Sequence, residues 1–229
     1  MDKDQLKKQA ADYAIDNYIQ SGMVVGLGAG STSLKGVQRL AERLACGDLK
    51  DIVGIPAAKV IAEEARRLNI PLSTLDEHPV IDLTFDGADE VDPHLNLIKG
   101  GGGALLREKI VAQASQQEII IVDESKQVPV LGTHWAVPIE VIPFGLGSHK
   151  HFLESIGGQP QLRLDKDNQP YLTDQGNYIL DTHFGEIHDP ETLAMQLNNR
   201  AGIVEHGLFL GLATQLIVAT AEGIRLIAP

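Results

Sequence analysis

The stretch MVVGLGAGSTSLKGVQRLAERLA, residues 23–45, decides the fold of this chain. It opens with a short apolar run that suits a buried strand, and it continues through a glycine-rich turn at 28–32. Helical character resumes at Ser33 and lasts to Ala45. A strand, a glycine turn and a helix in this order form the first unit of a parallel α/β sheet.

Strand-like and helix-like segments alternate along the rest of the first half of the chain. The strand-like segments are 51–55, 80–85 and 118–122, and the helix-like segments are 4–20, 57–68 and 104–114. Parallel strands require crossover connections of one hand. The pattern therefore predicts an α/β fold with a doubly wound, mostly parallel, Rossmann-like sheet and helices on both faces.

The pattern of predicted elements changes after Pro129. Short alternating strands are predicted at 161–164 and 178–181, with a helix at 190–198, which indicates a second, smaller α+β domain, ferredoxin-like, over 130–206. The last segment predicts a hairpin that returns to the first sheet. We therefore expect one domain from 1–129 plus 207–229 and another from 130–206.

Composition excludes several classes of protein. The formal net charge of −12 argues against nucleic acid as a partner, because phosphate backbones are bound by clusters of Lys and Arg. No stretch is long and apolar enough for a membrane span, and the N-terminus does not read as a secretory signal, so we expect a cytoplasmic protein without a membrane partner. The single cysteine permits no intrachain disulfide. The histidines show no metal-ligand spacing, and we expect His149 and His151 to form a surface pair.

Polar clusters follow the predicted strands at 28–32, 86–90, 99–103 and 123–126. Ligands of parallel sheets bind at the carboxyl ends of the strands, so we expect these four turns to converge on one edge. The first cluster, Gly28-Ala-Gly-Ser-Thr, suits a phosphate bound by unpaired backbone N–H groups. Two alternatives are a purely structural turn and a dinucleotide fingerprint, but the second strand ends in Gly54-Ile-Pro56 without the acidic residue that a dinucleotide requires.

The cluster Asp86-Gly-Ala-Asp-Glu places carboxylates within five residues, which is costly unless ligand hydroxyls, cations or protonation relieve the repulsion. A solvated acidic turn and a Mg²⁺ or Ca²⁺ site are the alternatives.

The cluster Lys99-Gly-Gly-Gly-Gly suggests a loop whose N–H groups face a ligand, since four glycines are costly to order. Glu108 follows in the second turn of the predicted helix and can point back over Ala104 towards this loop. The alternative for Glu108 is a surface residue paired with a Lys or Arg.

Together these segments resemble type A ribose-5-phosphate isomerases. The resemblance is carried by Lys7, Gly28-x-Gly30-Ser31-Thr32, Asp86-Gly-Ala-Asp89-Glu90, Lys99-Gly-Gly-Gly with Arg107-Glu108-Lys109, and Lys126, and it extends to 138–143 and 176–181. Two departures are Ala29, where the family often has Thr, and Gly54-Ile-Pro-Ala-Ala, which replaces a serine-rich turn.

The resemblance implies interconversion of ribose 5-phosphate and ribulose 5-phosphate in the pentose phosphate pathway, without metal or cofactor, by a homodimer or homotetramer. With the residue chemistry, it suggests Glu108 as the acid/base, Lys99 at the oxyanion, and Asp86 and Asp89 at ring opening and the hydroxyls. The full expected substrate site is Lys7, Gly28, Gly30, Ser31, Thr32, Asp86, Gly87, Ala88, Asp89, Lys99, Gly100, Gly101, Gly102, Glu108 and Lys126. An NAD-linked oxidoreductase and a non-catalytic sugar-phosphate sensor are the alternative functions.

Overall fold

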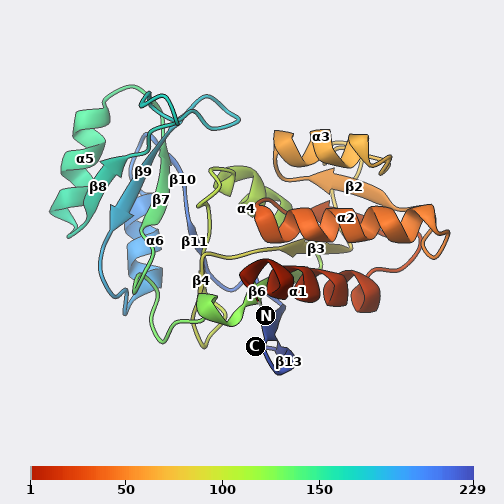
Figure 1. Ribbon diagram of the computed structural model, residues 1–229. Helices are drawn as coiled ribbons and strands as arrows, with labels where there is room; N and C mark the ends of the chain where they lie inside the picture. Colours follow the sequence, from red (N-terminus) through yellow and green to blue (C-terminus); the bar gives the residue numbers. More distant parts are fainter. Residues whose placement is uncertain (1) are drawn as a thin grey trace. The chain divides into compact units, whose positions relative to one another are not determined.

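The computed structural model describes residues 2–229, which pack into two units (Figure 1). The first unit comprises the chain up to Ala88 together with Arg107–Lys126 and Gly211–Pro229, and the second comprises Asp89–Leu106 and Gln127–Leu210. Residues 89–106, which we expected in the first domain, thus pack with the second unit. The predicted division into one domain from 1–129 with 207–229 and another from 130–206 concerns domains that fold independently, and it remains a prediction.

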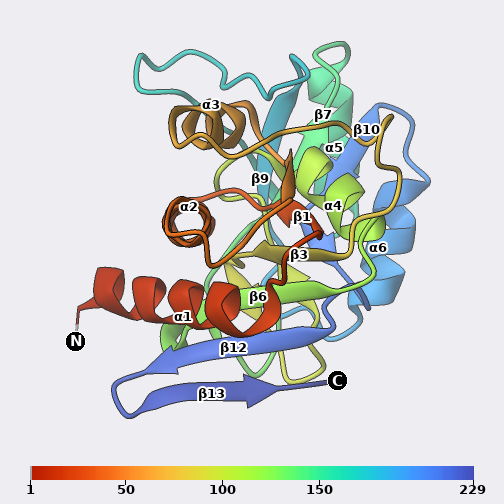
Figure 2. The ribbon, with the colours of Figure 1, turned by 90° about the vertical axis from the view of Figure 1, so that its right-hand side faces the viewer.

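A six-stranded sheet forms the centre of the first unit. Its strands are β1 (Val24–Leu27), β2 (Val53–Pro56), β3 (Leu83–Asp86), β6 (Glu118–Asp123), β12 (Gln215–Thr220) and β13 (Gly223–Ile227). They are arranged in the order β13-β12-β6-β3-β1-β2, and every neighbouring pair is parallel except the β12–β13 hairpin at the edge (Figure 2). The mostly parallel sheet and the returning C-terminal hairpin are confirmed.

Helices cover both faces of this sheet. They are α1 (Lys3–Tyr18), α2 (Ser31–Ala45), α3 (Lys59–Arg67) and α4 (Leu105–Gln113). Successive strand residues point to opposite faces, so Phe85 and Thr84 mark the two sides of β3. The Phe85 ring packs against Gly36 of α2, whereas Thr84 and Val111 of α4 both lie against Gly26 of β1. The doubly wound arrangement is therefore confirmed, with α1 beside α2 on one face and α4 on the other (Figure 2).

The first helix is fixed at its start by a capping box. The Asp2 carboxylate accepts the Gln5 N–H at 2.8 Å, and the Gln5 side chain accepts the Asp2 N–H at 3.1 Å. The helix ends at Tyr18, because Ile19 has an extended backbone, two residues before the predicted end. Leu6, Ala10 and Ile15 form part of its buried face.

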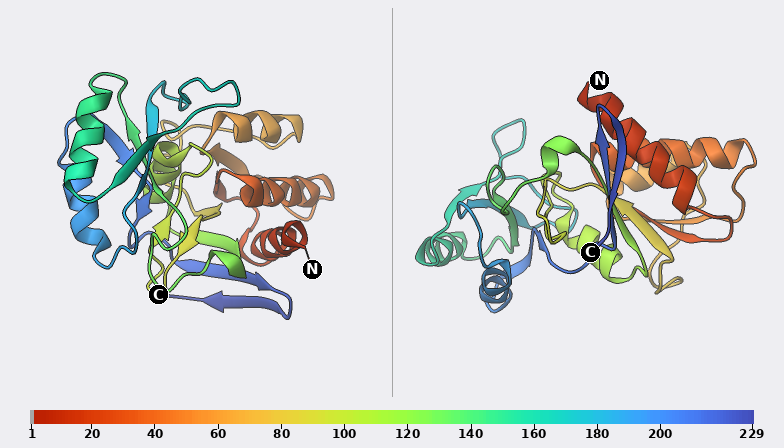
Figure 3. Two further views of the ribbon diagram at one scale, coloured as in Figure 1. Left: turned by 60° about the vertical axis from the view of Figure 1, so that its left-hand side comes forward. Right: turned by 90° about the horizontal axis from the view of Figure 1, so that it is seen from below.

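The second unit has a ferredoxin-like core. Its elements in chain order are β7 (Val137–Val141), α5 (Leu146–Ser155), β8 (Gln159–Leu162), β9 (Tyr178–His183), α6 (Pro190–Asn198) and β10 (Ile203–His206). The strands lie in the order β10-β7-β9-β8, all antiparallel, which confirms the predicted ferredoxin-like α+β topology. Figure 3 shows α5 and α6 side by side on one face of this sheet. Leu153 of α5 and Leu197 of α6 belong to one apolar core with Ile139 and Leu180.

The second unit also contains a small sheet that we did not predict. Its strands are β4 (Glu90–Val91), β5 (Leu97–Ile98) and β11 (Leu208–Phe209), in the order β11-β5-β4. The glycine cluster at 99–103 follows β5, so it does not follow a strand of the parallel sheet as expected. The other three clusters follow β1, β3 and β6 of the parallel sheet.

Two further findings concern membrane-spanning helices and the expected histidine pair. Within residues 2–229, the helices are too short or too polar to cross a membrane. His149 is only 4% exposed and its Nε2 lies 3.2 Å from the carbonyl oxygen of Phe144, so the expected surface pair with His151 is wrong.

The close approach of α4 to β1 gives a test of this packing. A methyl group at position 26 would lie 1.7 Å from Thr84 Oγ1 and 2.9 Å from Val111 Cγ1. We expect Gly26→Ala to lower the free energy of unfolding by about 2–3 kcal/mol, because the buried Thr84 and the helix must both shift. Urea denaturation measures this change.

Gly147→Ala is the matched control, since it adds the same methyl group to α5 with no atom within 4 Å. We expect Gly147→Ala to be neutral or to stabilise by up to about 1 kcal/mol. Equal unfolding midpoints for the wild type and Gly26→Ala would contradict the described packing.

Candidate active site

The first unit has its topological switch point between β1 and β3. The chain runs outward from β1 to β2 on one side and to β3, β6 and β12 on the other. In open parallel sheets, the crevice beyond the carboxyl ends of two such strands is where ligands bind. Gly28 follows β1 and Asp86 ends β3, so the first two polar clusters of the sequence meet at this point.

The meeting of these two strand ends requires a glycine. The Gly28 N–H donates to the carbonyl oxygen of Phe85 at 3.1 Å. A methyl group at position 28 would lie 2.2 Å from the Asp86 carboxylate, which is much shorter than a normal van der Waals distance. Gly28 thus lets the first turn lie directly against Asp86.

Asp86 is buried, at 1% exposure, and its orientation is fixed by donors from both turns. Its Oδ1 accepts the N–H of Ala29 at 3.0 Å and the N–H of Gly87 at 2.7 Å, and it lies 2.8 Å from Ser33 Oγ. Sequence reasoning missed Ser33. The signal available in the sequence was its position four residues after Ala29, directly after the glycine turn. Its burial and the 2.9 Å contact of its hydroxyl with the Ala29 carbonyl are seen only in the structure.

A candidate phosphate site lies at the start of α2. The helix begins after Gly30, whose φ of 93° favours glycine and whose position offers no side-chain cap to the first N–H groups. Lys7 of α1 donates from Nζ to Ser31 Oγ at 3.0 Å. Uncapped N–H groups, a hydroxyl and an ammonium in one place are suited to an anion.

The remaining predicted residues of the first unit lie at the same edge of the sheet. Gly87 is close to the turn before α2, since a methyl group there would lie 3.7 Å from Thr32 Cβ. Lys126 ends the short helix η1 (Glu124–Lys126) that follows β6, the strand next to β3. Ala88 is half-buried and ends this part of the first unit.

Glu108 lies in the first turn of α4 and is 6% exposed. The helix begins at Leu105 rather than at Ala104, which moves Glu108 from the predicted second turn to the first. The alternative of an exposed surface glutamate is wrong. A buried glutamate is uncommon and indicates a specific use.

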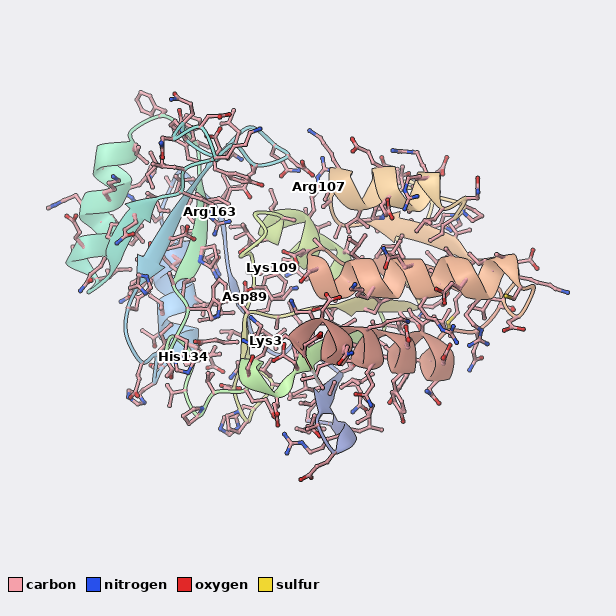
Figure 4. The ribbon with its side chains drawn as sticks, viewed as in Figure 1. Lys3, Asp89, Arg107, Lys109, His134 and Arg163 are labelled. Carbon is pink, nitrogen blue, oxygen red and sulfur yellow. The ribbon has the colours of Figure 1, made fainter. Side chains whose placement is uncertain are left out.

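The second unit holds the other part of the predicted set, including Asp89 (Figure 4). Lys99 is 2% exposed, its Nζ is 5.4 Å from the centre of the Phe209 ring, and its N–H donates to the Gly207 carbonyl at 2.9 Å. Gly100 to Gly103 form a turn in which the Gly103 N–H donates to the Gly100 carbonyl at 2.9 Å.

The acidic cluster at 86–90 divides between the two units. Asp89 Oδ2 accepts the Gly101 N–H at 2.8 Å. The buried Glu90 accepts the backbone N–H groups of Gly132, His134 and Trp135, so its role is to fix a loop. Within residues 2–229, no group of three or more His, Cys, Asp or Glu residues is arranged to hold a metal ion.

Comparison with known proteins identifies the family of this chain. The family described as Ribose 5-phosphate isomerase A (phosphoriboisomerase A) matches residues 53–223. A protein of Chloroflexus aurantiacus named ribose-5-phosphate isomerase A is 57% identical over 221 residues, covering 96% of this chain and 92% of its own length. A protein of the same name from Desulfatibacillum aliphaticivorans is 55% identical, covering 97% of this chain and 96% of its own.

Solved structures agree with this result. A D-ribose-5-phosphate isomerase in complex with phospho-erythronic acid is 40% identical, with a TM-score of 0.97 and full coverage of both chains at 100%. The ribose 5-phosphate isomerase of Plasmodium falciparum is also 40% identical, with a TM-score of 0.95 and 99% of each chain covered.

The contact between Ser33 and Asp86 gives a test of the first unit's site. We expect Ser33→Ala to fold but to lower the free energy of unfolding by about 1–3 kcal/mol, because the buried Asp86 loses a polar neighbour. Thermal and urea denaturation measure the change. Ser155→Ala, which removes an exposed serine hydroxyl from α5, is the control and should cost less than about 0.5 kcal/mol. Equal losses in the two variants would contradict a structural role of Ser33 at Asp86.

Proposed function

This chain belongs to the ribose 5-phosphate isomerase A family, and from this premise we propose that it interconverts D-ribose 5-phosphate and D-ribulose 5-phosphate through a cis-enediolate, with Glu108 as the general acid and base. The observation that carries the proposal is the burial of Glu108, at 6% exposure, in the helix that follows the glycine loop. Family membership also favours an isomerase over the oxidoreductase and sensor alternatives.

The phosphate end of the substrate binds at the start of α2. Lys7 and Ser31, joined at 3.0 Å, supply an ammonium and a hydroxyl, and the N–H groups of the first turn supply further donors. Thr32 and Lys126 complete the anchor. Binding energy from this remote group aligns the reacting carbons with the acid/base, which is how a non-reacting part of a substrate accelerates a reaction.

Proton transfer needs one carboxylate. In the open-chain aldose, Glu108 takes the proton from C2 while the C1 carbonyl becomes an enediolate oxygen. Glu108 then returns a proton to C1, O2 becomes the ketone oxygen, and the O2 proton passes to O1. One group on one face of the enediolate serves both steps, because donor and acceptor carbons are adjacent.

Charge on the enediolate requires a preorganised cation. Lys99 is suited to this task because burial holds its ammonium in place and excludes water, which strengthens its interaction with a developing oxyanion. The glycine loop that follows Lys99 supplies N–H donors.

Ring opening requires proton transfer at the hemiacetal before isomerisation begins. One group must donate a proton to the ring oxygen O4 and another must accept the proton of the C1 hydroxyl. We assign these tasks, and the binding of the sugar hydroxyls, to Asp86 and Asp89. Their oriented carboxylates, each accepting backbone N–H bonds, support this assignment.

A ligand of a relative supports the proposed intermediate. The solved D-ribose-5-phosphate isomerase with a TM-score of 0.97 is a complex with phospho-erythronic acid. Its carboxylate is planar and negatively charged, as an enediolate is, and its other end is a phosphate. We propose the same pattern of recognition for this chain, together with assembly into a homodimer or homotetramer and work in the cytoplasmic pentose phosphate pathway, as the family resemblance suggests.

The role of Glu108 can be tested by removing its charge without changing its shape. We expect Glu108→Gln to lower turnover of ribose 5-phosphate by about 10²–10⁴-fold, because an amide cannot take a proton from carbon. Binding of ribose 5-phosphate, measured by calorimetry, should change little.

Glu63→Gln, at an exposed position of α3, is the matched control and should keep full turnover. Wild-type turnover in Glu108→Gln would refute the assignment of the base.

A further inference from the structure

The reaction proposed above assigns no role to a half-buried ion pair in the second unit. Arg163, at the end of β8, pairs with Asp181 of β9, with Nε to Oδ2 at 2.9 Å and Nη2 to Oδ1 at 2.5 Å. The two side chains are 15% and 30% exposed. Such a two-point pair fixes the guanidinium plane, because Asp181 lies in β9 and Arg163 directly follows the adjacent strand β8, where its N–H donates to the Ile179 carbonyl at 2.9 Å.

The third nitrogen of this guanidinium, Nη1, is directed at the glycine loop. Arg163 Nη1 donates to the carbonyl oxygens of Gly100 at 3.0 Å and Gly101 at 3.1 Å. The ion pair therefore connects the four-stranded sheet to the loop that follows Lys99.

These two contacts of the carbonyl groups also fix the direction of the N–H groups of Gly101 and Gly102. In a trans peptide, the carbonyl of one residue and the N–H of the next point in opposite directions. The carbonyls of Gly100 and Gly101 face Arg163, so the N–H groups of Gly101 and Gly102 face away from it. The Gly101 N–H meets Asp89 Oδ2 at 2.8 Å on that far side.

Tyr171 holds the next peptide of the same loop. Its hydroxyl lies 3.4 Å from the Gly102 carbonyl, and its ring lies 5.8 Å from Arg163 Cζ. Burial raises the pKa of Tyr171 above its usual range, so the hydroxyl stays protonated and can donate at neutral pH. A methyl group at Gly103 would lie 2.4 Å from the Tyr171 hydroxyl oxygen and 2.6 Å from its ring, which restricts the end of the turn to glycine.

We propose that Arg163 is a positioning residue of the isomerase: through the carbonyls of Gly100 and Gly101 it orients the N–H that holds Asp89 and presents the Gly102 N–H to a sugar oxygen. Consecutive glycines have no preferred conformation of their own, so a fixed cation must supply the order that the sequence lacks. The cation also polarises the Gly100–Gly101 peptide and strengthens its bond to Asp89. The inference rests on the proposed function for its catalytic consequence but not for its geometry.

Arg163→Ala tests the catalytic consequence. We expect kcat to fall about 10- to 100-fold, the loss typical of misplaced catalytic groups, while KM changes less, because the phosphate anchor of the first unit is untouched. Added guanidinium ion should restore part of the lost kcat in Arg163→Ala and should not activate the wild type. Arg163→Lys should remain impaired, since an ammonium cannot contact two carbonyls and a carboxylate in one plane.

Lys166→Ala removes an exposed cation from the neighbouring turn and is the control, with unchanged kinetics expected. A wild-type kcat in Arg163→Ala would overturn the proposal. So would a loss of activity that matches the unfolded fraction seen by circular dichroism and is not rescued by guanidinium.

The geometry can be tested without any activity measurement. In protein labelled with ¹⁵N-glycine, Arg163→Ala should shift the Gly101 amide resonance and accelerate its hydrogen exchange, whereas Lys166→Ala should not. An unchanged Gly101 amide would overturn the proposal even if the isomerase assignment holds. Conversely, full turnover in Glu108→Gln would overturn the base assignment and leave this geometry intact.

Discussion

The contact of Gly28 with Asp86 is the constraint on which the first unit's site depends. The two residues end adjacent parallel strands at the switch point of the sheet, and a methyl group at position 28 would lie 2.2 Å from the carboxylate. Because the strands are this close, the start of α2, with its uncapped N–H groups, begins beside a buried and oriented carboxylate. The proposed phosphate site and the proposed sugar-binding acid then follow from one packing arrangement.

Charged side chains order flexible glycine segments in both units. Asp86 accepts N–H groups from the turns after β1 and β3, and Arg163 donates to two carbonyls of the loop after β5. This local arrangement also explains how a chain with a net charge of −12 can recognise an anion. The long-range field repels a sugar phosphate, so we propose that recognition depends on short-range donors held in fixed positions, such as the Lys7 ammonium.

The sequence predicted the elements that have strong local signals. The apolar run at 118–122 is the centre of the sheet, and the helix predicted at 190–198 is found at Pro190–Asn198, with Pro190 in its first turn and Asp189 as its cap. The strands of the small sheet, such as β5 (Leu97–Ile98), have two residues and show no periodicity. Arg163 was missed because its partners at Gly100 and Gly101 are more than sixty residues away, and no local pattern reports such a contact. Motifs therefore identified the groups that we propose to contact the substrate, whereas the groups that orient them emerged only from the folded structure.

The central claim is that a carboxylate transfers a proton between neighbouring carbons, and exchange with solvent tests this claim most directly. Wild-type protein is mixed with ribose 5-phosphate in D₂O, and the products are followed by ¹H and ²H NMR. A carboxylic acid exchanges its proton with solvent, so the account predicts deuterium at one of the two hydrogen positions of C1 in ribulose 5-phosphate and at C2 of the recovered aldose. Ketose that forms with the C2 hydrogen fully retained at C1, and with no deuterium at any time, would show hydride transfer and contradict the account.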